Sequence, residues 1–164
     1  MASYRFVGFF AALNRTLYID RTRRRDVARA SSAMGSALGA GDRVLVFAEG
    51  TSGMGTHVLP FRSALVGAAI EGDAVVIQPV AIAYRAICRV PISQNERSRL
   101  AWVGDMALGD NLADIIGSGP KDVAIAFGTP YPATGDRKVL TQRAEDEVRA
   151  MLAALNRGKA LPSP

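Results

Sequence analysis

A short polar segment, Glu49, Gly50 and Thr51, directly follows the continuous apolar run Val44–Phe47. Such a run predicts a buried strand, and open α/β sheets usually bind ligands beyond the carboxyl ends of their strands. Glycine allows close backbone approach, threonine offers a hydroxyl, and a glutamate carboxylate accepts hydrogen bonds from ligand hydroxyls. These residue types predict a binding site, but they also fit a plain strand-to-loop turn whose glutamate faces water.

A cation stands in a similar place, because Arg21 ends the strand-like segment Thr16–Asp20. If this strand neighbours Val44–Phe47 in one sheet, Arg21 and Glu49 emerge at the same edge, where they would offer a cation for phosphate beside an acceptor for hydroxyls. The alternative is an exposed arginine that pairs with Asp20 or with an acid of the following helix.

The chain contains one histidine, His57, and one cysteine, Cys88. A single cysteine excludes an intramolecular disulfide and a cysteine-cluster zinc site. His57 lies in a glycine-rich stretch and is expected to be a solvated loop residue, with a role as general base as the alternative. Cys88 has no histidine nearby, so thiolate catalysis is not expected. No metal or redox cofactor is implied.

The charge of the chain is unevenly distributed. The net charge is +5, and the first 62 residues carry all of this excess. A basic region can attract phosphate-bearing small molecules, anionic lipid headgroups or nucleic acid, and composition alone does not choose among them. The longest apolar runs, Phe6–Leu13 and Ala74–Tyr84, are shorter than the ~20 residues of a membrane-spanning helix.

The hydrophobic pattern predicts alternating helices and strands in a chain of 164 residues with 49% hydrophobic residues. We expect an α/β layered fold with a largely parallel central sheet flanked by helices, as a single domain over residues 1–157 with a loose tail at 158–164. The strand Ala74–Ala83 is expected to be buried on both faces. The expected helices span 6–13, 22–39, 63–70, 111–116 and 140–155, the expected strands span 16–20, 44–47, 74–83, 100–103 and 123–127, and residues 50–60 form a loop.

Four sequence blocks together resemble the phospholipid/glycerol acyltransferase family, which includes 1-acylglycerol-3-phosphate acyltransferases. The blocks stand in the family's order: Thr16–Arg21 (TLYIDR), Phe47–Ser52 (FAEGTS), Leu59–Arg62 (LPFR) and Val76–Ala81 (VIQPVA). The resemblance implies a glycerolipid acyltransferase-like layered fold. It also implies transfer of a fatty acyl group from acyl-CoA or acyl-carrier protein to the hydroxyl of a lysophospholipid, 1-acylglycerol-3-phosphate, with no cofactor besides the acyl donor.

The resemblance also implies which residues and partners take part. The partners would be a lysophospholipid acceptor, an acyl thioester donor and an anionic membrane surface, with the protein peripheral on the cytoplasmic face of the membrane. Nucleic acid is not expected, since no nucleic-acid motif is present. The substrate-binding residues would be Arg21, Glu49, Gly50, Thr51, Ser52 and Arg62.

Two departures from the family pattern limit this interpretation. The family's catalytic block is His-x-x-x-x-Asp, in which the imidazole removes the proton of the acceptor hydroxyl. No histidine precedes Arg21, and the residue five places after His57 is Arg62, so no catalytic residue is assigned. We therefore expect an N-terminally truncated, nearly inactive chain, or alternatively a non-catalytic fragment that binds anionic lipid or a partner chain. Ser52 replaces a frequent arginine, which leaves the acceptor headgroup open.

Overall fold

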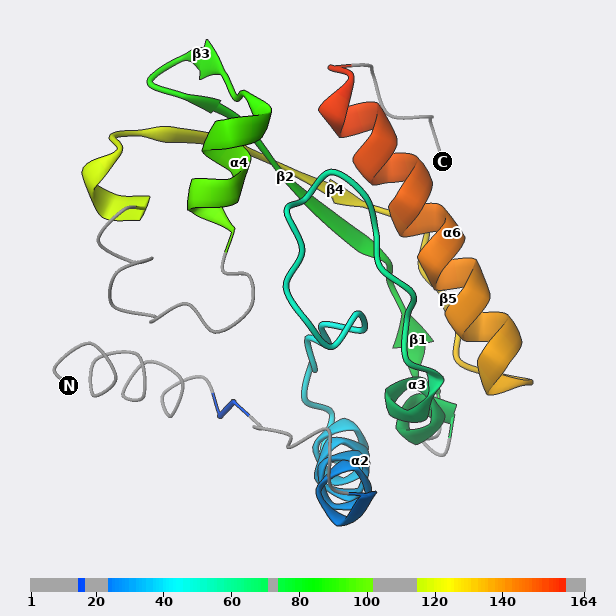
Figure 1. Cartoon of the computed structure of the whole chain (residues 1–164). Coiled ribbons are helices and arrows are strands. Elements are labelled where there is room, and N and C mark those ends of the chain that lie inside the picture. The colour runs from blue at the N-terminus through cyan, green and yellow to red at the C-terminus, as the bar shows by residue number, and fades with distance from the viewer. Residues whose placement is uncertain (1–14, 17–23, 71–73, 102–114, 159–164) are drawn as a thin grey trace, which may run out of the picture.

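The structure, a computed structural model, describes residues 15–16, 24–70, 74–101 and 115–158. Its elements form a three-stranded sheet in the order β3-β2-β4, a two-stranded sheet of β1 and β5, and helices, of which α6 packs against the three-stranded sheet, α3 against α6 and α2 against α3 (Figure 1). The helices are α2 (Arg24–Gly39), α3 (Ser63–Ile70), α4 (Gln94–Leu100) and α6 (Arg137–Asn156). The strands are β1 (Val76–Ile77), β2 (Val80–Ile87), β3 (Val90–Pro91), β4 (Lys121–Phe127) and β5 (Tyr131–Pro132).

Every strand pairing among the described residues is antiparallel. The expectation of a largely parallel central sheet is therefore wrong for this part of the chain. One reason is local: β2 and β3 are joined by Cys88 and Arg89, which have φ values of 49° and 66°. Two successive residues with positive φ form the tight turn of a hairpin, which reverses the chain and brings its two strands together antiparallel.

The two faces of the β2–β4 pair differ in side-chain size. Ala81 and Ala126 lie opposite each other and are 2% and 1% exposed, whereas the neighbouring pair Ile82 and Ile125 is 50% and 53% exposed. The expectation that 74–83 is buried on both faces is therefore wrong, because successive residues of a strand point to opposite faces and only one face is covered. The run also breaks before Pro79, which separates β1 from β2.

Helix α6 covers the alanine face of this sheet (Figure 1). Small alanine side chains allow a helix to approach closely, and the larger residues that fill the space between the layers come from the helix and from a loop. The buried cluster consists of Val58, Ala81, Ala83, Ala126, Val148, Met151, Leu152 and Leu155. Because Val58 belongs to the loop that was predicted over 50–60, the main core includes part of that loop.

Polar contacts hold the N-terminal end of α6. Asp136 caps the helix, and hydrogen bonds from the N–H groups of Val139 and Lys138 hold the pKa of its carboxyl below the usual value. The hydroxyl of Tyr131 in β5 donates to the carbonyl of Leu140 at 3.2 Å. These contacts fix the start of α6 against the small β1–β5 sheet.

Two predicted strands are wrong. Residues 42–47 form no strand, and the side chains of Leu45 and Phe47 are 72% and 74% exposed. A strand requires a partner for its backbone groups, and no described segment pairs with this run. Leu100 ends helix α4 rather than beginning a strand. This helix begins at a capping box, in which Ser93 and Glu96 bond each other's backbone N–H groups.

The other predicted elements that fall on described residues are confirmed. These are the helices at 24–39, 63–70 and 140–155, the strand at 123–127 and the loop at 50–60. Residues 6–13, 17–23, 102–103, 111–114 and 159–164, which carry further predictions, lie outside the described residues. Within the part of the chain that the structure describes, no helix is both long and apolar enough to cross a membrane.

The unequal faces of the sheet predict unequal responses to substitution. Ala126→Leu should lower the free energy of unfolding by about 1–3 kcal/mol, because it overpacks the contact with α6. Ile125→Thr, one residue away on the exposed face, should change it by about 0.5 kcal/mol or less. Urea denaturation of the two variants measures both values. Equal losses would show that the Ile125 face is covered in solution.

Candidate functional site

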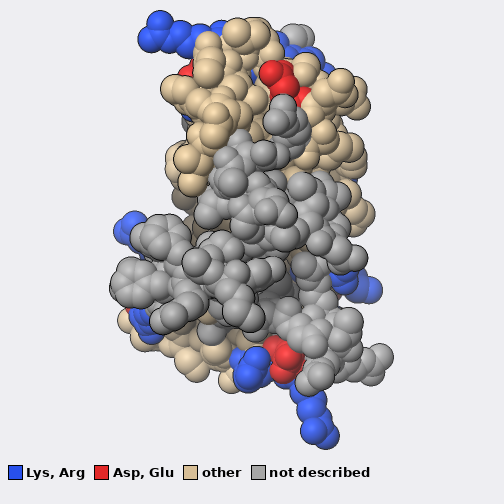
Figure 2. Space-filling view, turned by 60° about the vertical axis from the view of Figure 1, so that its left-hand side comes forward, with Lys and Arg blue, Asp and Glu red and all other residues tan. Residues whose placement is uncertain are grey.

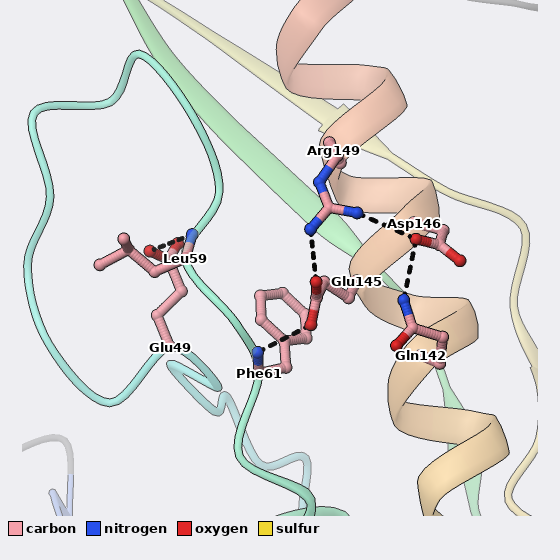
Figure 3. A network of polar contacts seen from close by, with 7 residues as sticks. All are labelled: Glu49, Leu59, Phe61, Gln142, Glu145, Asp146 and Arg149. Carbon is pink, nitrogen blue, oxygen red and sulfur yellow. Dashed lines mark hydrogen bonds and ion pairs between the residues drawn. The ribbon is translucent and has the colours of Figure 1, made fainter.

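All the predicted site residues except Arg21 lie on one loop, residues 48–62, whose two ends are held together. The N–H of Arg62 donates to the carbonyl of Ala48 at 2.9 Å. The N–H of Leu59 donates to Glu49 Oε2 at 3.1 Å, and Figure 3 shows this side chain reaching across the neck of the loop. We call this segment the 48–62 loop; its neck is formed by Ala48, Glu49, Leu59 and Arg62.

Glu49 is half-buried, and one of its two carboxylate oxygens is occupied within the protein. No described residue bonds Oε1, so this oxygen can accept a hydrogen bond from a ligand hydroxyl or amine. Glu49 therefore combines two tasks: it closes the loop, and it presents an acceptor at its neck.

The turn that follows Glu49 depends on glycine. Gly50 has a φ of 64°, a left-handed conformation that favours glycine, and its N–H donates to the carbonyl of Phe47 at 3.0 Å. The turn leaves Thr51 and Ser52 exposed. Their hydroxyl groups can therefore reach a ligand at the surface beside Glu49.

Arg62 supplies a cation on the other side of the neck. Its side chain is exposed and has no hydrogen-bond or ion-pair partner among the described residues. An unpaired guanidinium can bind a carboxylate or a phosphate through two parallel hydrogen bonds. The backbone bond between Ala48 and Arg62 thus brings this cation to the segment that carries Glu49. Arg21 lies outside the described residues, so its position beside Glu49 stays a prediction.

Two residues of α6 that were not predicted from the sequence hold the loop. Glu145 Oε2 accepts the N–H of Phe61 at 2.8 Å, and Asn156 Nδ2 donates to the carbonyl of Gly55 at 3.0 Å. One signal was present in the sequence, because Glu145 stands between Ala144 and Val148 on the apolar side of the helix. A carboxylate in such a position needs a partner.

His57 does not have the surroundings of a general base. It is exposed, and its Nδ1 lies 3.0 Å from the hydroxyl of Thr56. None of the described carboxylates forms an ion pair with it, so the imidazole lacks the group that orients and charges a catalytic histidine. Across the described ranges, no group of three or more His, Cys, Asp or Glu side chains could hold a metal ion.

The described basic side chains do not form a single patch on the face shown in Figure 2. Lys and Arg residues there are scattered around the face rather than gathered over one element.

The curated proteins to which this chain is similar all carry the names of acyltransferases. The chain is 38% identical to a lyso-ornithine lipid O-acyltransferase of Brucella abortus over 94% of its length and 61% of the relative's. It is 28% identical to a protein of the same name from Rhizobium meliloti, over 96% of this chain and 57% of that one. It is also 28% identical to a 1-acyl-sn-glycerol-3-phosphate acyltransferase of Neisseria gonorrhoeae, over 84% and 52%.

The chain therefore spans a little more than half the length of the curated relatives it matches. No solved structure matches it. A sequence model of the acyltransferase family matches residues 1–83, half of the chain, and this range includes the whole 48–62 loop. On this match the chain belongs to the acyltransferase family.

Proposed function

We propose that this chain is the acceptor-binding part of a lysolipid O-acyltransferase. In the whole protein, an acyl group would pass from a thioester of coenzyme A or acyl-carrier protein to a lysolipid hydroxyl. The observation that supports the proposal is the closed 48–62 loop, in which a backbone bond joins Arg62 to Ala48 beside Glu49. The chain that carries this loop is aligned over 94% of its length with a lyso-ornithine lipid O-acyltransferase.

Each residue of the loop has a role that follows from its surroundings. The guanidinium of Arg62, which no described residue binds, would bind the anionic group of the acceptor. Oε1 of Glu49 would accept a hydrogen bond from the acceptor's hydroxyl or amine, while Oε2 keeps the loop closed. The exposed hydroxyl groups of Thr51 and Ser52 would complete the polar surface, and Gly50 allows the acceptor to approach the backbone.

Of the two candidate acceptor headgroups, ornithine fits this loop better than phosphate. It carries a carboxylate and a free amine, which match one cation, Arg62, and one acceptor, Glu49. A phosphate headgroup carries more negative charge, and Ser52 removes a cation that many phosphate-binding members of the family have at this position. Lysophosphatidate is therefore the second acceptor to test, consistent with the Neisseria relatives.

Acyl transfer needs a general base. The acceptor hydroxyl attacks the thioester carbonyl, the base takes the hydroxyl proton, the carbon–sulfur bond breaks, and the thiol leaves as the ester forms. The family uses His-x-x-x-x-Asp for this step, and these 164 residues do not contain that pattern. We propose that this chain supplies acceptor binding, at the cytoplasmic surface of an anionic membrane, and that the base comes from outside this sequence.

Arg62→Gln should weaken binding of the chain to phosphatidylcholine vesicles that contain lyso-ornithine lipid by about 10-fold, because a charge-assisted hydrogen bond is lost. Vesicle sedimentation measures the binding, and added salt should reduce it further. Arg157→Gln is the matched control, since Arg157 is also exposed but lies at the far end of α6. Equal losses of vesicle binding in the two variants would show that Arg62 contributes only nonspecific charge attraction. Vesicles with lysophosphatidate instead of lyso-ornithine lipid decide between the headgroups.

Catalysis should depend on an added histidine–aspartate segment. The 164-residue chain should consume acyl thioester slowly, and an N-terminal extension that bears His-x-x-x-x-Asp should raise the rate by ~10²–10⁴-fold. In the extended protein, Glu49→Ala should lower the rate by about 10-fold, and Glu49→Gln should lower it less because the amide oxygen can still accept from Leu59.

Two outcomes would change this picture. Enzyme-like turnover by the unextended chain would mean that another base operates, and His57→Ala would then test the remaining imidazole. Binding of lysolipid by the extended protein without any thioester consumption would favour a non-catalytic lipid-binding role.

A further inference from the structure

Helix α6 lies outside the residues matched by the family model, yet it makes specific polar contacts with the 48–62 loop. We propose that Glu145 is a positioning residue, which fixes the neck of this loop from α6 and so sets where Glu49 and Arg62 stand. The geometric part of this proposal is independent of the proposed function. Its consequence for acceptor binding rests on that function.

Glu145 is a buried carboxylate with both oxygens occupied. Its side chain is 10% exposed, Oε2 accepts the N–H of Phe61 at 2.8 Å, and Oε1 pairs with the guanidinium of Arg149 (Figure 3). Removing the carboxylate would leave the Phe61 N–H without an acceptor in a half-buried position. A backbone donor in that state is unfavourable, so the loop would have to move to satisfy it.

Phe61 lies between the two residues whose N–H groups close the neck, so a contact at Phe61 affects both closing bonds. It precedes Arg62, whose N–H bonds Ala48, and it follows Leu59 by two residues, whose N–H bonds Glu49. The contact joins residues 84 positions apart in the sequence, so local structure does not provide it. Displacement of Phe61 would therefore disturb both bonds that close the loop.

A second contact from α6 holds the tip of the same loop. Asn156 donates to the carbonyl of Gly55 at 3.0 Å and accepts from Arg97 of α4 at 3.2 Å. Glu145 and Asn156 are eleven residues apart on the helix, which is roughly 16 Å along its axis at ~1.5 Å per residue. Between these two anchors Val58 packs in the core, so α6 holds the loop at its neck, its middle and its tip.

The neighbouring residue Asp146 provides a matched control. It also binds Arg149, at 3.1 Å, and it accepts from Gln142 at 3.0 Å, but its side chain is 59% exposed and both of these partners lie on α6 rather than on the loop. Asp146→Asn and Glu145→Gln each remove one negative charge beside Arg149. Only substitutions at Glu145 touch the acceptor of the Phe61 N–H.

The direct test is NMR-detected hydrogen exchange of the Phe61 and Leu59 amides in the 164-residue protein. Glu145→Leu, which removes the acceptor at similar size, should speed exchange at both amides by about 10-fold or more relative to the amides of Ala81 and Ala126 in the sheet. Glu145→Gln, which keeps an acceptor oxygen, should restore most of the protection. Asp146→Asn should leave it unchanged.

Three results would overturn the proposal: equal acceleration at the sheet amides, no acceleration at Phe61 and Leu59, or the same change in Asp146→Asn. If Glu145→Leu does not fold, the variants Glu145→Gln and Asn156→Ala test whether α6 positions the loop. Asn156→Ala should shift the carbonyl carbon resonance of Gly55, which loses its donor, while Glu145→Gln keeps the Phe61 amide protected. A tip that is unaffected would remove α6 as the support of the loop.

Acceptor binding gives the second readout. Glu145→Leu should weaken binding to vesicles containing lyso-ornithine lipid by about 10-fold, and Glu145→Gln by about 3-fold or less, because neutral hydrogen bonds are weaker than charged ones. If the unsubstituted protein binds neither lyso-ornithine lipid nor lysophosphatidate, the proposed function fails, and the exchange experiment still decides the positioning role. If Glu145→Leu speeds exchange at Phe61 and Leu59 but leaves acceptor binding unchanged, the neck of the loop does not determine the binding site.

Discussion

The packing of α6 against the alanine face of the β2–β4 sheet is the contact on which the rest of the described structure depends. This face carries the small side chains of Ala81, Ala83 and Ala126, so the helix lies close to the sheet. The larger side chains of the helix fill the space between helix and sheet. Val58 packs in the same space and so anchors the 48–62 loop to this core. The position of the loop is thus a consequence of how helix and sheet pack.

On this apolar layer, carboxylates of the chain hold backbone N–H groups that have no partner in a helix or strand. Glu49 binds Leu59 at the neck of the loop, Glu145 binds Phe61, and Glu147 binds Thr129 beyond the end of β4. Each bond satisfies a donor in an irregular segment and joins it to a rigid element or to the other arm of the loop. The loop is ordered by these bonds, although it contains no regular secondary structure.

The same arrangement explains why the family match and the supporting contacts lie in different halves of the chain. The four blocks that identify the family fall before residue 84, and they include the residues proposed to meet the acceptor. Helix α6, which holds the 48–62 loop through Glu145 and Asn156, follows at 137–156. A binding loop and its support need only meet in space, so the sequence pattern of one says little about the other.

The sequence by itself determined the local elements and the chemistry of the loop. Helical periodicity gave α2, α3 and α6, and the glycines of the 48–62 loop excluded regular structure there, because these signals act over a few residues. The types of Glu49, Gly50 and Thr51 predicted a polar binding segment, and the family resemblance added Arg62. Tertiary structure decided the rest: that Val44–Phe47 has no pairing partner among the described residues, that β2 pairs antiparallel with β4, and that Glu145 reaches Phe61. Each of these depends on which distant segments meet, and such meetings are set by packing rather than by local pattern.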